Sequence, residues 1–172
     1  MTKLWRDASS LILIFRNSLR LSATTISPYD YSILMLKRSS KSKFMPNAYV
    51  FPGGVTDKYD MNRDWLELIK GCENPVRSIE NMILKNVPRP LLLQEDKESE
   101  SNELPKDIAF RIGAIRETFE EAGILLQKSV GQSSFNPSHD VLMEWREKVC
   151  QDPTEFYNMC RQFCICPDVW SL

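Results

Sequence analysis

The stretch Arg116-Glu117-Thr118-Phe119-Glu120-Glu121-Ala122-Gly123 closes the most strongly patterned segment of this 172-residue chain. Apolar residues recur at spacings of four and three, which predicts a helix with one apolar stripe. That stripe consists of Ile108, Ile112, Ile115, Phe119 and Ala122. Pro105 and Asp107 are start signals for this helix, and Gly123 is the residue type that ends one.

The acidic residues of this helix form a second pattern. Glu117 precedes Glu120 and Glu121 by three and four positions, so all three carboxylates share one helix face. Arg116 lies one turn before Glu120, and we expect the two to pair. Mg²⁺ takes oxygen ligands and relieves repulsion among clustered carboxylates. For the helix taken alone, a solvated acidic face is the equally simple interpretation.

Upstream residues predict strands joined by polar loops. Residues 8–15 predict a buried first strand and residues 31–36 a second. The basic loop Lys37-Arg38-Ser39-Ser40-Lys41-Ser42-Lys43 is either a solvated loop or an anion contact. Residues 49–55 predict a strand broken at Phe51-Pro52-Gly53-Gly54, where glycine permits close approaches that a Cβ would block.

The remaining segments predict mainly helices. Residues 61–108 resemble an insertion outside the core, with short helices near Trp65 and Ile79 and an acidic stretch at 94–103. Residues 124–126 predict a short buried strand, and 127–138 a polar loop. Two helices follow: one carries Val141 and Trp145, and the other starts at Asp152-Pro153-Thr154-Glu155. We expect no strand after residue 126.

Composition and rare residues exclude several classes of protein. Lys plus Arg total 22 and Asp plus Glu total 23, which excludes a general basic surface for nucleic acid. The apolar run at 11–15 is far shorter than the roughly 20 residues that span a bilayer. Five cysteines, an odd number, favour free thiols in a reducing compartment. His139 is the single histidine, so a zinc site built on Cys160, Cys164 and Cys166 is disfavoured.

The stretch 116–124 resembles the second half of the Nudix hydrolase signature, Arg-Glu-apolar-x-Glu-Glu-x-Gly-apolar. The matching positions are Arg116, Glu117, Glu120, Glu121, Gly123 and Ile124. Thr118 stands where an apolar residue is usual, a mild departure because threonine offers a methyl group. In the first half, five residues separate Gly54 from Asp60, which stands where the family has glutamate. A long block through Ile115 then replaces the family's seven-residue spacer.

This split resembles the coenzyme A diphosphatase branch of the Nudix family. The branch carries Lys/Arg-Arg-Ser, then Phe-Met-Pro, then Phe-Pro-Gly-Gly before a long insertion. This chain shows Lys37-Arg38-Ser39, Phe44-Met45-Pro46 and Phe51-Pro52-Gly53-Gly54. The resemblance implies an α/β Nudix fold: a mixed sheet sandwiched between helices, with a helical insertion splitting the motif. It implies a single domain over 1–172, incomplete at its C-terminus, with 127–172 a helical extension and later strands missing.

The resemblance also implies a chemistry. Glu117, Glu120 and Glu121 would hold Mg²⁺, with Mn²⁺ as a substitute, and Glu120 or Glu121 would serve as general base. Arg116 would assist in catalysis. Substrate contacts would come from Arg38, Ser39, Gly53 and Gly54. The implied reaction is hydrolysis of the diphosphate of coenzyme A or acyl-coenzyme A to 3′,5′-ADP and (acyl-)phosphopantetheine. Two alternatives stay open: another nucleoside diphosphate derivative as substrate, or a truncated chain without turnover.

Location and partners follow from the same resemblance. Members of the branch are often peroxisomal, yet Trp170-Ser171-Leu172 differs from the Ser-Lys-Leu tripeptide, so mitochondrial and cytosolic locations stay open. We expect a small-molecule substrate, no nucleic-acid partner and no membrane span. The sequence does not determine the oligomeric state.

Overall fold

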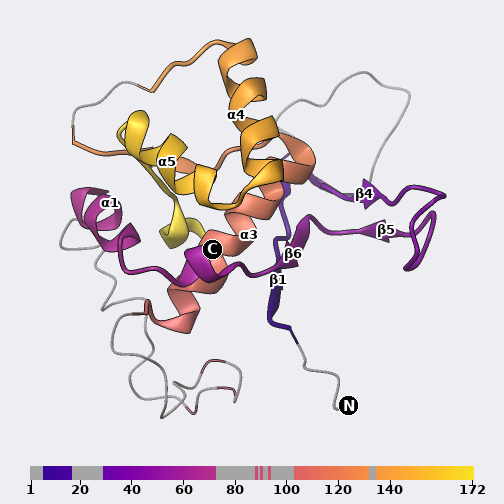
Figure 1. The fold of residues 1–172 in the computed structure, drawn as a ribbon. Helices are drawn as coiled ribbons and strands as arrows, with labels where there is room; N and C mark the ends of the chain where they lie inside the picture. The colour runs from indigo at the N-terminus through magenta and orange to yellow at the C-terminus, as the bar shows by residue number, and fades with distance from the viewer. Residues whose placement is uncertain are drawn as a thin grey trace.

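The computed structural model describes residues 6–16, 29–72, 88, 90, 93, 103–131 and 135–172. Figure 1 shows helix α3 (Lys106–Ala122) running through the middle of the molecule, with α4 (His139–Gln151) and α5 (Thr154–Gln162) covering one side. Strands β1 (Ala8–Ser10) and β6 (Gly53–Val55) pack on α3 from another side. The central helix therefore lies between a helical layer and a strand layer.

Helix α3 forms where the apolar spacing predicts it. Ile108, Ile112, Ile115 and Phe119 are buried, at 0 to 1% exposure. The helix begins after Pro105 and ends at Gly123, which adopts a left-handed conformation with φ of 69°. The Gly123 amide donates to the Phe119 carbonyl, which closes the last turn. The stripe therefore contributes the centre of the hydrophobic core.

The described strands form four antiparallel pairs. These are β1 with β6, β2 (Ile14–Arg16) with β3 (Tyr31–Ile33), β4 (Leu36–Lys37) with β5 (Tyr49–Val50), and β7 (Gln127–Ser129) with β8 (Ile165–Pro167). The predicted mixed sheet would also contain parallel strand pairs. The strands that the structure describes pair only in the antiparallel sense. The predicted break at Phe51-Pro52-Gly53-Gly54 falls where the chain changes partner, from β4 to β1. The single strand predicted over 31–36 is wrong, because this segment divides into β3, which pairs with β2, and β4, which pairs with β5.

The predicted single buried strand over 8–15 is wrong. The segment divides into β1 and β2, because β1 pairs with β6 whereas β2 pairs with β3. Strand β2 is exposed along its length, and Leu11 is the buried apolar residue of this segment. The broken strand predicted over 49–55 is confirmed as β5 and β6.

The first part of the presumed insertion belongs to the core, contrary to expectation. Helix α1 (Trp65–Cys72) forms as predicted, but Trp65 and Ile69 are 1% and 0% exposed within the main hydrophobic cluster. Trp65 meets Tyr157 of α5 edge-on, with ring centroids 5.0 Å apart. A short 3-10 helix, η1 (Lys58–Met61), leads from β6 towards α1. The helix predicted near Ile79 and residues 94–102 lie outside the described residues.

Cysteine pairing also differs from the prediction. The structure joins Cys72 of α1 to Cys166 of β8 in a disulfide, whereas Cys150, Cys160 and Cys164 are free thiols. The prediction of five free thiols is therefore wrong for two of them. Spacing along the sequence carried no signal for this pair, because 94 positions separate the two residues.

The region after α3 contains strands that were not predicted. The strand predicted over 124–126 is wrong, because these residues are irregular. The strand begins directly after them as β7, which pairs with β8. Helices α4 and α5 form as predicted, and Asp152 Oδ1 accepts from the Thr154 amide at 2.9 Å at the start of α5. A 3-10 turn, η3 (Val169–Ser171), follows β8. Among the described helices, none has the length and apolarity to span a bilayer.

Candidate active site

The glycine pair of β6 lies directly against the acidic face of α3. The Gly53 amide donates to Glu121 Oε2 at 3.0 Å. A Cβ on Gly54 would overlap the Glu117 carboxylate, and a Cβ on Gly53, whose φ is 153°, would overlap the backbone of β1. The absence of side chains at Gly53 and Gly54 is therefore what lets the β6 backbone reach two of the three predicted carboxylates. The structure brings Gly53, Gly54, Glu117 and Glu121 together.

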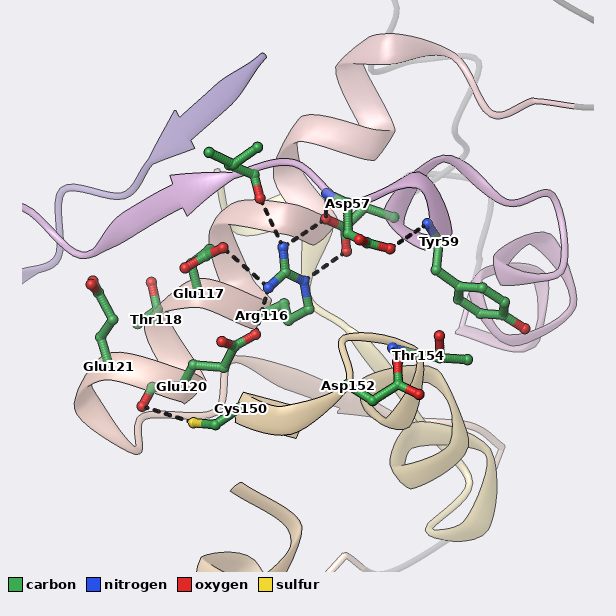
Figure 2. Close-up of polar contacts among 12 residues, drawn as sticks. Asp57, Tyr59, Arg116, Glu117, Thr118, Glu120, Glu121, Cys150, Asp152 and Thr154 are labelled. Atoms are coloured by element: carbon green, nitrogen blue, oxygen red, sulfur yellow. Dashed lines mark hydrogen bonds and ion pairs between the residues drawn. The ribbon is translucent and has the colours of Figure 1, made fainter. Parts of the chain in front are cut away.

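Arg116 is the centre of the polar network. Its guanidinium is 2% exposed and bonds three carboxylates and one backbone carbonyl. Nε and Nη2 donate to Asp60 at 3.0 and 2.9 Å, and Nη2 also donates to the Val55 carbonyl at 3.2 Å. Figure 2 shows the opposite side of the guanidinium facing Glu117 and Glu120.

The pairing of Arg116 with Glu120 is present as predicted, and Arg116 also holds Glu117. Nη1 donates to Glu117 Oε1 at 3.1 Å and to Glu120 Oε1. Glu121 stands apart from the guanidinium in Figure 2 and is exposed, bound instead to the Gly53 amide. The three carboxylates are therefore held by two different anchors, Arg116 and the β6 backbone.

Asp60 is a site residue that the sequence marks only as a departure from the family motif. It is 2% exposed, and both of its carboxylate oxygens accept hydrogen bonds from Arg116. The Asp57 amide donates to Asp60 Oδ2 at 2.8 Å, while Asp57 Oδ1 accepts from the Tyr59 amide at 2.8 Å. This reciprocal capping fixes η1. The sequence signal for this residue was its spacing from Gly54, which matches the position of the family's glutamate. At this position Asp60 pairs with Arg116.

Burial and charge set the protonation of this cluster. Burial raises the pKa of Glu117 and of Glu120, and Arg116 only partly opposes that rise. Burial lowers the pKa of Arg116, but the hydrogen bonds and charge of Asp60 outweigh this and raise it overall. Arg116 is therefore a permanent cation, whereas its two glutamate partners carry their charge at a cost.

The donor set suits a hard divalent cation by its chemistry. Glu117, Glu120 and Glu121 supply carboxylate oxygens, the ligand type that such cations prefer. Burial, the largest cause of the raised pKa of Glu117 and Glu120, makes their charged forms costly. In the arrangement shown, no group of three acidic, histidine or cysteine side chains within the described residues converges on a single point.

The two other predicted substrate residues lie elsewhere. Arg38 and Ser39 belong to the loop joining β4 to β5, which extends away from the helical body in Figure 1. Arg38 Nε donates to the Phe44 carbonyl at 3.0 Å, and Nη2 donates to Ser42 Oγ at 2.9 Å. Ser39 Oγ accepts from the Lys41 amide at 3.2 Å. Arg38 organises its own loop, and its contact with substrate stays a prediction.

The other candidate residues do not form a second site. His139 is exposed at the start of α4. Cys166 is in the disulfide, and Cys160 is fully buried, where burial raises the pKa of its thiol well above the usual range. Thr118, the departure inside the motif, is fully buried, and its hydroxyl donates to the Ala114 carbonyl at 2.7 Å. The hydroxyl thus finds a partner within the helix.

The matching family model and the two relatives described below share the name NUDT19. Residues 5–172 match the family described as NUDT19 Nudix domain. The chain is 37% identical over 180 residues to "Acyl-coenzyme A diphosphatase NUDT19" of Gallus gallus, covering 98% of this chain and 48% of that protein. It is 36% identical over 183 residues to the Homo sapiens protein of the same name, covering 98% and 49%. The chain spans about half the length of the curated relatives it matches.

A solved structure supports the fold. The chain resembles the NUDIX hydrolase from Alicyclobacillus acidocaldarius with a TM-score of 0.58 and 22% identity, covering 98% of this chain and 59% of that one. At this identity the likeness speaks for the fold alone. The α/β Nudix fold that the motif implied is confirmed by the family match and this neighbour.

Proposed function

Because the chain belongs to the Nudix hydrolase family, we propose that it is the motif-bearing part of a diphosphatase that hydrolyses coenzyme A and acyl-coenzyme A. The products are 3′,5′-ADP and (acyl-)phosphopantetheine. The observation that carries the proposal is the placement of Glu117 and Glu121 against the Gly53-Gly54 backbone. The names of the chicken and human relatives supply the substrate class.

Glu117, Glu120 and Glu121 are the residues that would hold Mg²⁺, with Mn²⁺ as a substitute. When bound, the cation neutralises the phosphate charge that repels a nucleophile and makes a water molecule easier to deprotonate. The protein's part is to supply oxygens of the right hardness on one helix face. The cost of burying Glu117 and Glu120, seen in their raised pKa, is a reason for the site to favour a cation.

The chain's own residues accept the proton, orient the carboxylates and face the substrate. Glu120 or Glu121 accepts the proton of the attacking water as general base. Arg116 holds Glu117 and Glu120 in place and is itself held by Asp60, so it acts on the orientation of the carboxylates. The β6 backbone, bare of side chains at Gly53 and Gly54, lets the Glu117 and Glu121 carboxylates lie directly against it, so a diphosphate held by the acidic face would lie beside this backbone.

Parallel assays of coenzyme A and ADP-ribose with Mg²⁺ test this assignment. Faster turnover of coenzyme A supports it, and preferential turnover of ADP-ribose would assign another nucleoside diphosphate derivative instead. Glu121→Gln serves as the variant, because it keeps the size of the side chain but removes the negative charge. We expect Glu121→Gln to abolish metal-dependent turnover, and unchanged turnover would refute the assignment of the carboxylates.

A further inference from the structure

Helix α4 supplies a second arginine to the acidic helix, from a segment that lies outside the Nudix motif. Arg146 Nε donates to the Glu120 carbonyl at 2.8 Å, and Nη2 donates to the Glu121 carbonyl at 3.0 Å. One planar guanidinium thus binds two consecutive backbone carbonyls of α3. Both carbonyls belong to residues whose side chains are proposed above as metal ligands.

These carbonyls lie where a helix is least secure. The last four carbonyls of an α-helix have no donor within it, so the final turn frays unless other groups bind them. In α3 the Gly123 amide satisfies Phe119, and Arg146 satisfies Glu120 and Glu121. Cys150 Sγ, one turn further along α4, lies 3.9 Å from the Glu120 carbonyl. A cation here also complements the negative end of the helix dipole.

We propose that Arg146 is a positioning residue that fixes the backbone from which Glu120 and Glu121 project, and so sets the geometry of the divalent-cation site. Glu120 is held twice, by Arg116 at its carboxylate and by Arg146 at its carbonyl. Glu121 is likewise held by the Gly53 amide and by Arg146. This inference rests on the proposed function in so far as it takes these glutamates as metal ligands.

The geometry requires arginine in particular. Its fork presents parallel N–H groups to two acceptors at once, whereas the ammonium of lysine is a single point charge. Residues that orient metal ligands from behind typically change metal affinity by about 10–100-fold when removed. Arg146 reaches the ligands through the main chain, so its loss should loosen the turn without removing any ligand atom.

The test compares Arg146→Met and Arg146→Lys with Arg161→Met. Arg161 is an exposed arginine of α5, so its substitution gives the same loss of charge outside the site. Mn²⁺ alone is the probe, titrated by electron paramagnetic resonance. Amide hydrogen exchange at residues 120–126 and thermal unfolding are measured on the same samples. The Mg²⁺ dependence of coenzyme A hydrolysis is the fourth readout.

We expect Arg146→Met to weaken Mn²⁺ binding by about tenfold, to raise amide exchange in the last turn of α3 and to raise the Mg²⁺ concentration needed for half-maximal rate. Arg146→Lys should retain the fold but only part of the Mn²⁺ affinity, and Arg161→Met should match the unsubstituted chain. Unchanged Mn²⁺ affinity in folded Arg146→Met, or full rescue by lysine, would overturn the proposal.

The two proposals fail in different ways. Mn²⁺ binding that depends on Arg146, without hydrolysis of coenzyme A, would refute the substrate and leave the positioning role standing. Failure of the unsubstituted chain to bind Mn²⁺ would refute the positioning role together with the metal ligands. If Arg146→Met does not fold, the lysine variant decides, because it keeps the aliphatic stem and the charge.

Discussion

Asp60 and Arg116 form a buried two-pronged ion pair that ties the 3-10 helix η1 to the acidic helix α3. Nε to Oδ1 and Nη2 to Oδ2 measure 3.0 and 2.9 Å, and both side chains are 2% exposed. The pair joins the two halves of the split motif, although 56 positions separate the two residues. Through Arg116 it reaches Glu117 and Glu120.

Asp60→Asn should destabilise the chain by about 3 kcal/mol, because removing one partner leaves the buried guanidinium with an uncompensated charge. Urea unfolding measures the loss. Asp64→Asn is the matched control, since Asp64 is exposed in the neighbouring turn and its substitution should cost less than about 1 kcal/mol. Equal stability of the two variants would show that the buried ion pair between Asp60 and Arg116 does not stabilise the fold.

Gly54→Ala should reduce Mg²⁺-dependent turnover by at least about tenfold, the cost of misplacing a reacting group. The added Cβ would push against the Glu117 carboxylate. Gly131→Ala provides the comparison, because Gly131 has a positive φ of 64° and open space around it. That variant should lose stability through backbone strain of about 1 kcal/mol and keep its turnover. Normal turnover in Gly54→Ala would show that β6 does not crowd the site.

Much of this site was predictable from local pattern, but not its anchors. The helix at 106–122, its end at Gly123 and the shared face of the glutamates follow from spacing alone. The role of Asp60 did not, because its partner lies in another element. The Arg146 contact was equally hidden, since a sequence does not show which helix crosses the end of α3.

The missed strands have a similar explanation. Strand β7 consists of half-buried Gln127, Lys128 and Ser129, which show no apolar alternation, and β8 contains a proline. Their strand character comes from pairing with each other across 36 or more positions, which no local window contains. The core position of Trp65 and the Cys72–Cys166 disulfide likewise depend on contacts between distant segments.

Thr118→Val should cost about 1 kcal/mol or less, the usual net value of one hydrogen bond. The Thr118 hydroxyl donates to the Ala114 carbonyl within the helix, and valine keeps the same shape in a fully buried position. We expect unchanged turnover, since the residue stands where Nudix hydrolases usually have an apolar side chain. A stability loss above about 3 kcal/mol in urea unfolding would show that the hydroxyl has a further role.

Arg38→Met should raise the KM for coenzyme A by about tenfold, the value of one charged hydrogen bond, because we expect Arg38 to contact its 3′-phosphate or its diphosphate. The comparison with dephospho-coenzyme A tests the first of these contacts. The KM for dephospho-coenzyme A, which lacks that phosphate, should change less. Lys70→Met, on α1, controls for the loss of one positive charge. Equal effects of Arg38→Met on both substrates would instead assign Arg38 to the diphosphate, which both carry, or to the shape of its loop, where it binds Ser42 and Phe44.

The most direct measurement is release of 3′,5′-ADP from coenzyme A by the purified chain, in Mg²⁺ and in EDTA, with Glu121→Gln alongside. We expect release in Mg²⁺, none in EDTA, and none from Glu121→Gln under either condition. Release that persists in EDTA, or that survives the loss of the Glu121 carboxylate, would contradict the assignment of this acidic face as the Mg²⁺ site.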